Sequence, residues 1–255
     1  MMSFFPSRAV AFTLLDFPVH WYGIMYLLGF LMVYKLAPKL QRYRGLYLKK
    51  SDWSNLLSWV IIGVIVGGRL GYVFFYDWPY FQANPMDIFA IWNGGMASHG
   101  GFIGVALVTW LYARWHNISI FKLVDSAVVP IALALALGRV GNYINIELYG
   151  TVTDLPWGQS IPGVEGLRHP TAVYAILKNT IIGIICMLAL TNSKKVGLPT
   201  ACFLMSYAVL RFVVEFFRIP TVENTEVFGI MFTQGQLLTI PLALAGLLLL
   251  ALRVR

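Results

Sequence analysis

The segment from Gly138 to Gly150 gathers the side chains best suited to chemistry. It holds a guanidinium, a carboxylate, two carboxamides and two phenols directly after an apolar run over residues 128–137. On a helix, Arg139, Asn142 and Asn145 recur every three residues and share roughly one face. Polar groups beside such a run are costly and usually mark a binding or catalytic site. The alternative is that these residues only satisfy one another between packed helices.

A second polar group lies in the sequence Arg211-Phe212-Val213-Val214-Glu215-Phe216-Phe217-Arg218. Arg211, Glu215 and Arg218 are spaced to share one helix face. Arginine before glutamate is the weaker order for a local ion pair, so helix stabilisation alone explains the pattern poorly. Guanidinium groups match phosphate oxygens with paired hydrogen bonds, and Arg139 and Arg211 together favour a phosphate site.

His99 opens a run of mostly small residues, His99-Gly100-Gly101-Phe102-Ile103-Gly104. Histidine is the natural general base near neutral pH, which makes this imidazole a candidate proton acceptor. A hydrogen-bonding role at a helix end is the alternative.

Three further residues are candidates because they lie within or at the start of apolar runs. Arg69 follows Gly67 and precedes Gly71, and glycines spaced by four are typical of close helix crossing. We interpret the glycines as packing residues and the arginine as a candidate site residue. Tyr22 and Tyr26 begin the first apolar run.

The elements that position these residues are membrane-spanning helices. Of the 255 residues 58% are hydrophobic and 12% charged, against about 25% charged in soluble domains. Spanning helices need roughly 20 apolar residues. The runs of about that length cover residues 21–39, 54–76, 97–115, 121–143, 171–190, 199–217 and 235–252. We expect an all-α polytopic membrane protein with about seven spans, forming a single domain over residues 1–255.

The loops between these runs set the orientation. The net charge of +8 could suggest nucleic acid, but the basic residues form short clusters in alternate loops. These clusters are Lys39 to Lys50, Arg114 with Lys122, Lys194 with Lys195, and Arg253 with Arg255, whereas the opposite loops carry mostly acidic residues, with Arg168 and Arg218 as exceptions. The positive-inside rule then places the N-terminus outside and the C-terminus in the cytoplasm, with no role for nucleic acid.

In this orientation the candidate residues converge on the outer half of the membrane, which favours a cavity open to the outer side. Asp125 lies near the inner end of its run and is interpreted as a helix-start or packing group. Residues 144–168 are expected to form a small cap on the outer side, and residues 85–95 to lie in the membrane interface.

Neither a metal nor a cofactor is expected. The four histidines show no metal-ligand spacing, and Cys186 and Cys202 lie inside apolar runs, where packing is their expected role.

The motifs together resemble the phosphatidylglycerol–prolipoprotein diacylglyceryl transferase family. They are the His99 run, the segment from Gly138 to Gly150, His169-Pro170 with Tyr174, and the stretch from Arg211 to Arg218. The resemblance extends from Trp21 to Gln236, essentially the whole chain. Several motifs in the same order make it specific.

This resemblance implies an enzyme of the bacterial inner membrane with its active site toward the periplasm. Such an enzyme transfers diacylglycerol from phosphatidylglycerol to the lipobox cysteine thiol of a prolipoprotein, next to its signal peptide. The product is a thioether, glycerol phosphate is released, and the reaction is the first step of lipoprotein maturation.

The resemblance also implies roles for individual residues. Arg139 and Arg211 match phosphate-handling residues, His99 matches the proposed base, and Glu215 matches a carboxylate that positions Arg211. The residues expected to bind substrate are Tyr22, Tyr26, Arg69, Asn142, Asn145, Glu147, Glu215 and Arg218. Two positions depart from the family pattern, because Ala175 replaces a usual glutamate and Thr221 a usual aspartate.

Proteins of two other classes would also carry intramembrane arginines. A transporter or lipid-binding protein for an anionic solute is one, but the sequence has no evident repeat and no midplane cluster of the kind that transporters often show. A structural subunit of a membrane complex is the other, and in it Arg139→Ala or Arg211→Ala would alter assembly and leave catalysis unaffected.

Overall fold

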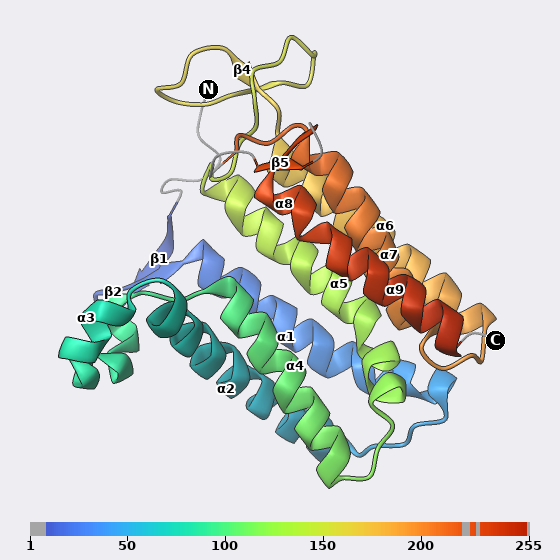
Figure 1. Cartoon of the computed structure of the whole chain (residues 1–255). Coiled ribbons are helices and arrows are strands. Elements are labelled where there is room, and N and C mark those ends of the chain that lie inside the picture. The colour runs from blue at the N-terminus through green and yellow to red at the C-terminus, as the bar shows by residue number, and fades with distance from the viewer. Residues whose placement is uncertain (1–8, 221–224, 228–229, 254–255) are drawn as a thin grey trace. The chain divides into compact units, whose positions relative to one another are not determined.

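The computed structural model describes residues 9–220, 225–227 and 230–253. Two compact units divide the chain, residues 1–45 with 124–255 forming the first unit and residues 46–123 the second. Most of the described chain is helical (Figure 1). The α-helices are α1 (Trp21–Leu40), α2 (Lys50–Phe75), α3 (Trp78–Ala83), α4 (Ser98–Trp115), α5 (Ile120–Ile144), α6 (Thr171–Asn192), α7 (Leu198–Glu215), α8 (Gln234–Leu237) and α9 (Thr239–Arg253).

The strands and 3-10 turns are short. Strands β1 (Val10–Leu14) and β2 (Phe17–His20), β3 (Gln159–Ser160) and β4 (Leu167–Arg168), and β5 (Thr225–Val227) and β6 (Ile230–Phe232) pair as antiparallel hairpins. The 3-10 turns are η1 (Gln41–Arg44), η2 (Pro85–Phe89) and η3 (Ile91–Asn93). The sequence analysis did not predict these strands, because segments of two to five residues show too little alternation.

The expected all-α membrane architecture is confirmed. Within the described residues, six helical segments are long and apolar enough to cross a membrane. They correspond to α1, α2, α5, α6, α7 and the pair α8–α9. The remaining predicted run forms α4, an 18-residue helix that is not among those six.

Two of the predicted runs differ most from the helices that form, each for a local reason. Helix α2 begins four residues early because the Asp52 carboxylate accepts the Lys49 backbone N–H at 2.8 Å, which caps the helix. The last predicted run is interrupted at Leu238, between α8 and α9. Pro241 has no N–H to donate to the Leu237 carbonyl, so a continuous helix would lose that bond.

The core of the first unit lies between α5 and α6. Val128, Val129 and Ala132 of α5 pack against Ile182, Cys186 and Leu190 of α6, and all six are buried. Helix α7 packs along both α6 and α9 (Figure 1). Cys186 is fully buried and contributes to packing, as the sequence analysis expected.

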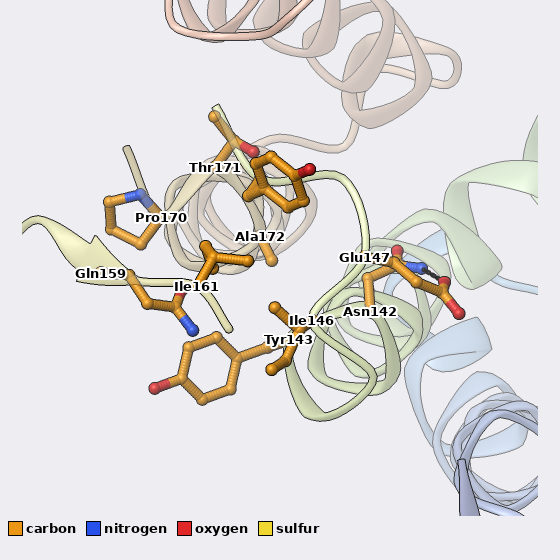
Figure 2. A pocket seen from close by; sticks show the side chains of 10 residues that line it. Asn142, Tyr143, Ile146, Glu147, Gln159, Ile161, Pro170, Thr171 and Ala172 are labelled. Carbon is orange, nitrogen blue, oxygen red and sulfur yellow. Dashed lines mark hydrogen bonds between the residues drawn. The ribbon is translucent and has the colours of Figure 1, made fainter. Parts of the chain in front are cut away.

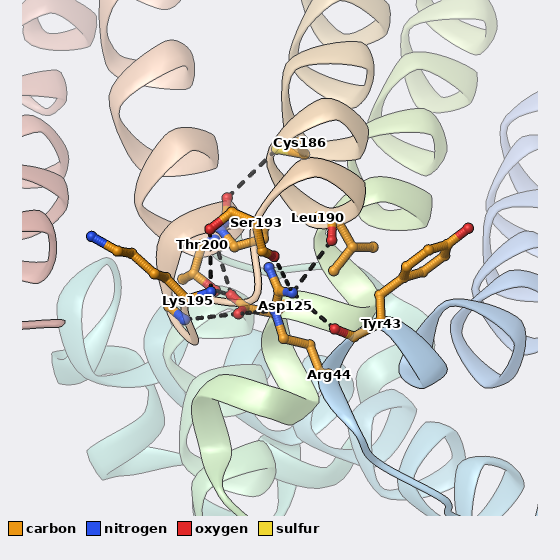
Figure 3. Close-up of polar contacts among 10 residues, drawn as sticks. Tyr43, Arg44, Asp125, Cys186, Leu190, Ser193, Lys195 and Thr200 are labelled. Atoms are coloured by element: carbon orange, nitrogen blue, oxygen red, sulfur yellow. Dashed lines mark hydrogen bonds and ion pairs between the residues drawn. The ribbon is translucent and has the colours of Figure 1, made fainter. Parts of the chain in front are cut away.

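Asp125 and Arg44 form a fully buried ion pair at one end of this core (Figure 3). Arg44 Nε donates to Asp125 Oδ2 at 2.8 Å, and Arg44 Nη1 donates to the Ser193 carbonyl. The backbone N–H groups of Gly197 and Thr200 donate to the same carboxylate. Asp125 therefore caps α7 and joins it to η1 and α5, which gives its predicted packing role a specific form.

In the second unit, α2 and α4 cross at their glycines. A Cβ on Gly63 would lie 2.9 Å from the Gly104 carbonyl oxygen, and a Cβ on Gly71 would lie 2.8 Å from Gly100 Cα. A Cβ on Gly67 would collide with the Gly100 carbonyl. The packing role predicted for the α2 glycines is confirmed, because the two backbones approach too closely for any side chain.

Candidate active site

A chain of side-chain hydrogen bonds forms at the end of α5. Arg139 Nη1 donates to Asn142 Oδ1 at 3.1 Å, and Asn142 Nδ2 donates to Glu147 Oε2 at 2.9 Å. Asn145 Nδ2 donates to the other carboxylate oxygen of Glu147 at 3.0 Å. Asn142 is buried, whereas Glu147 is exposed. Arg139 and Asn142 lie on the predicted face of α5, whereas Asn145 lies just past the end of the helix, and with Glu147 the four side chains form one connected polar group.

The backbone after α5 turns Glu147 back toward the helix. Ile146 and Leu148 both have φ of 56°, in the left-handed region that non-glycine residues seldom occupy. The Glu147 N–H donates to the Asn142 carbonyl at 2.9 Å, which holds this turn. Strained backbone of this kind often occurs at functional sites.

The second polar group projects from the end of α7. Arg211 Nη1 lies 2.7 Å from Glu215 Oε2, and Arg218 Nη1 lies 3.7 Å from the same oxygen. Burial and the nearby charge of Arg211 lower the pKa of the Arg218 guanidinium. Gly235 at the start of α8 packs against the Glu215 carboxylate, so closely that a Cβ would lie 2.5 Å from it. The glutamate is thus fixed from both sides.

The two polar groups meet at one pocket between α5, α6 and α7. The pocket encloses about 340 Å³, part of it open to the surroundings. Its charged lining residues are Arg139, Lys178, Arg211 and Arg218, and among the described residues that line it none is acidic. Asn142, Tyr207 and the small residues Thr171, Ala172 and Ala175 complete much of the wall. This arrangement suits a buried anion with an apolar attachment.

A smaller pocket of about 190 Å³ is lined by residues of the segment that follows α5 and of the start of α6 (Figure 2). Asn142, Thr171 and Ala172 line both pockets. The 144–168 segment contributes much of the lining of the smaller pocket, namely Ile146, Glu147, Tyr149, Gln159 and Ile161.

The predicted cap segment contacts α6 and the residues after α7 at its base. Tyr174 of α6 accepts a hydrogen bond from Trp157 Nε1 at 2.9 Å, and its hydroxyl lies 3.1 Å from His169 Nδ1. Gly150 forms a β-bridge with Arg218, and a Cβ on Gly150 would collide with the Phe217 carbonyl. This close approach requires glycine. It brings together Gly150, which ends the segment from Gly138, and Arg218, which ends the stretch from Arg211.

Tyr22 and Tyr26 also lie in the first unit. Their rings are 4.9 Å apart, and a Cβ on Gly141 would lie 3.2 Å from Tyr22 Cδ2. The absence of a side chain at this glycine therefore leaves room beside α5, and α1 occupies it.

Arg69 and His99 lie in the second unit. Arg69 donates to the backbone carbonyls of Asp87, Ile88, Ala90, Gly94 and Gly95, at distances from 2.5 to 3.2 Å. Its guanidinium thus holds the 3-10 turns after α3 in place. His99 is an exposed residue near the start of α4. Contact of either residue with substrate stays a prediction.

Lys178 is a pocket residue that the sequence analysis missed. Its side chain is 6% exposed and its Nζ lies 3.8 Å from the centroid of the Tyr207 ring. A signal was present, because Lys178 is the one charged residue in the run over residues 171–190, and charged residues inside spans are functional candidates by default.

The two departures from the family pattern are Ala175 and Thr221, and only the first lies within the described residues. Ala175 lines the larger pocket directly, so a methyl group stands in this wall where the family usually has a glutamate carboxylate. Thr221 lies outside the described residues.

The fold and the site define a multi-pass membrane protein with a cationic pocket inside its helical bundle. A family model described as prolipoprotein diacylglyceryl transferase matches residues 9–252. Proteins named phosphatidylglycerol–prolipoprotein diacylglyceryl transferase are similar over nearly their whole length. The one from Chromohalobacter salexigens is 40% identical over 252 residues, 98% of this chain and 93% of the relative.

Two other relatives carry the same name. The protein from Geobacter sulfurreducens is 41% identical over 240 residues, 93% of this chain and 92% of the relative. The protein from Pseudomonas aeruginosa is 37% identical over 251 residues, 98% of this chain and 94% of the relative. The chain belongs to the prolipoprotein diacylglyceryl transferase family.

Proposed function

We propose that this chain transfers the diacylglyceryl group of phosphatidylglycerol to a prolipoprotein cysteine thiol, forming a thioether and releasing glycerol phosphate. This is the first step of bacterial lipoprotein maturation. The observation that carries the proposal is the pocket lined by Arg139, Arg211 and Arg218 in a chain of this family. Arginines at the pocket match the phosphate, and the surrounding apolar helices suit the acyl chains.

In the proposed reaction the nucleophile belongs to the substrate protein. The thiolate attacks the glycerol carbon that carries the phosphate, so a carbon–sulfur bond forms as the carbon–oxygen bond breaks. The electron pair of the broken bond moves to the phosphate oxygen. Arg139 and Arg211 stabilise the negative charge that develops on this leaving group.

The thiol proton has two candidate destinations. His99 is a candidate base, and its exposed imidazole is open to a substrate. Alternatively, the positive field of Arg139 and Arg211 lowers the thiol pKa enough for another acceptor to suffice.

His99→Gln distinguishes the two routes. An essential base contributes about 100-fold or more to the rate, so the variant is expected to lose at least that much kcat if His99 is the base. A loss of less than about tenfold, measured at saturating substrate, would assign the proton to another acceptor.

The other predicted residues have supporting roles in this proposal. Asn142, Asn145 and Glu147 line the substrate site beside Arg139, and Glu215 positions Arg211 and Arg218. Tyr22, Tyr26 and Arg69 are assigned to substrate binding.

We place the enzyme in the bacterial inner membrane as one transferase domain, with residues 144–168 as a periplasmic cap. The protein substrate is recognised at its signal peptide and lipobox cysteine. Support comes from the charges of the loops and from the bacterial relatives named for this reaction.

The test combines purified protein in detergent with phosphatidylglycerol and a lipobox peptide. Mass spectrometry of the peptide cysteine and assay of glycerol phosphate report the two products. Arg139→Ala is expected to lose about 100- to 1000-fold in rate while the protein still inserts, because it removes stabilisation of developing charge. Arg114→Ala, an exposed arginine at the end of α4, is the matched control.

Absence of both products with folded wild-type protein would overturn the transferase proposal and favour the anion-transport alternative. Near-normal turnover by Arg139→Ala would instead remove the arginine from the phosphate site while leaving the reaction intact.

A further inference from the structure

Lys178 is a buried cation with no carboxylate partner among the described residues. It lines the larger pocket beside Arg139, Arg211 and Arg218, and 6% of it is exposed. Its ammonium lies over the face of the Tyr207 ring, with Nζ 3.8 Å from the ring centroid. An ammonium buried without a counter-ion is costly, so an anionic ligand beside Lys178 would stabilise the charged form of this side chain.

The charges around the pocket do not balance. Glu215 pairs with Arg211 and, at longer range, with Arg218. Arg139 contacts the neutral carboxamide of Asn142, which separates it from Glu147. Within the described residues, Arg139 and Lys178 therefore have no direct carboxylate partner, and the pocket carries more positive charge than one monoanion neutralises.

The proposed reaction supplies a second negative charge at this place. Phosphatidylglycerol is a phosphodiester with a single charge. Cleavage of its carbon–oxygen bond leaves a phosphomonoester, which carries a charge of about −1.5 to −2 near neutral pH because its second pKa is about 6. The phosphodiester of the lipid does not need the additional positive charge of Lys178, whereas the more highly charged phosphomonoester leaving group does.

We infer that Lys178 binds the phosphate of glycerol phosphate as it departs, so that it recognises the phosphomonoester product in preference to the phosphodiester substrate. This inference rests on the proposed function and deepens it. The ammonium acts as a point charge on the phosphate oxygens, whereas Arg139 and Arg211 provide paired hydrogen bonds. The Tyr207 ring holds the ammonium in place through a cation–π contact before the phosphate arrives.

The experiment compares wild type with Lys178→Met and Lys178→Arg in the transfer assay. Lys178→Met keeps the length of the side chain and removes its charge. It is expected to lower kcat by about 10- to 100-fold and to change KM for phosphatidylglycerol much less, because the lost contact forms with the leaving group. Lys178→Arg keeps the charge and is expected to recover most of the rate. Lys194→Met, at an exposed lysine after α6, is the control.

Product inhibition provides a readout that a purely structural role would not move. Wild type at about pH 7.5 is expected to be inhibited by glycerol phosphate at concentrations about tenfold lower than by its methyl ester, which keeps a single charge. This preference should shrink toward about pH 5, where the monoester also carries about one charge. In Lys178→Met the preference should fall to within about threefold.

Three results would overturn the inference. They are a kcat of Lys178→Met within about threefold of wild type, an unchanged preference for the monoester in that variant, or no such preference in wild type. The preference of wild type for the monoester is measured without any variant, so this test holds even if Lys178→Met does not fold. Wild type without any transfer would overturn the proposed function itself, whereas equal transfer by wild type and Lys178→Met would overturn this inference alone.

Discussion

Asn142 is the residue through which Arg139 and Glu147 are connected. Its carboxamide oxygen accepts from Arg139 while its nitrogen donates to Glu147. An ionised aspartate accepts hydrogen bonds and cannot donate them, so only the carboxamide serves both partners at this size. The arrangement keeps a guanidinium and a carboxylate near each other without letting them pair, which leaves the arginine free for an anion.

Asn142→Asp tests this connection with almost no change in volume. The new carboxylate would pair with Arg139 and repel Glu147, so the arginine would be neutralised in place. The rate of diacylglyceryl transfer is expected to fall by about 100-fold or more. Asn84→Asp, an exposed asparagine between α3 and η2, is the control for the same chemical change. Transfer within about threefold of wild type would show that Arg139 acts without this partner.

The elements that carry the site are held together at a distance from it. Asp125 accepts hydrogen bonds from the start of α7 and from Arg44, and Arg44 also donates to carbonyls at the end of α6. The position of α7 relative to α5 and α6 determines where Arg211 meets Arg139 and Lys178. This buried network therefore positions the pocket as well as stabilising the first unit.

Removing the Asp125 carboxylate should destabilise the first unit strongly. Asp125→Ala leaves Arg44 as a buried charge and the first N–H groups of α7 without their acceptor, so the expected loss is about 3–5 kcal/mol of unfolding free energy. Thermal denaturation in detergent measures the change. Arg42→Ala, at the exposed arginine in η1, should cost less than about 0.5 kcal/mol. Equal effects of the two substitutions would show that the ion pair contributes little.

For the whole molecule, the arrangement of charges predicts one orientation in the membrane. The loop between α6 and α7 carries Lys194 and Lys195, whereas the segment before α6 carries Asp154 and Glu165. Basic loops face the cytoplasm, so residues 144–168 should face outward.

Cysteine labelling in spheroplasts tests this orientation. A membrane-impermeant maleimide is expected to label Asp154→Cys and to spare Lys194→Cys, both of which replace exposed residues. The parent protein gives the background, since Cys186 is fully buried and Cys202 is partly buried. The opposite labelling pattern would reverse the predicted topology.

The sequence by itself determined the class of the protein and most of its helices. Long apolar runs have one stable form in a bilayer, because every backbone group must be paired within the segment. The helical spacing of Arg139 with Asn142, and of Arg211 with Glu215, also placed each pair on one face, since such neighbours interact through local geometry alone.

Only the tertiary structure decided which distant residues meet. Arg44 was counted as a basic loop residue, yet it is buried against Asp125, 81 residues away. Lys178 was visible as a lone charge, but its place beside Arg139 and Arg211 depends on how α5, α6 and α7 pack together. Helical periodicity gives the face on which a side chain lies and carries no information about the helix that covers that face. That choice is made by packing across the whole bundle, so the cationic pocket belongs to the tertiary structure.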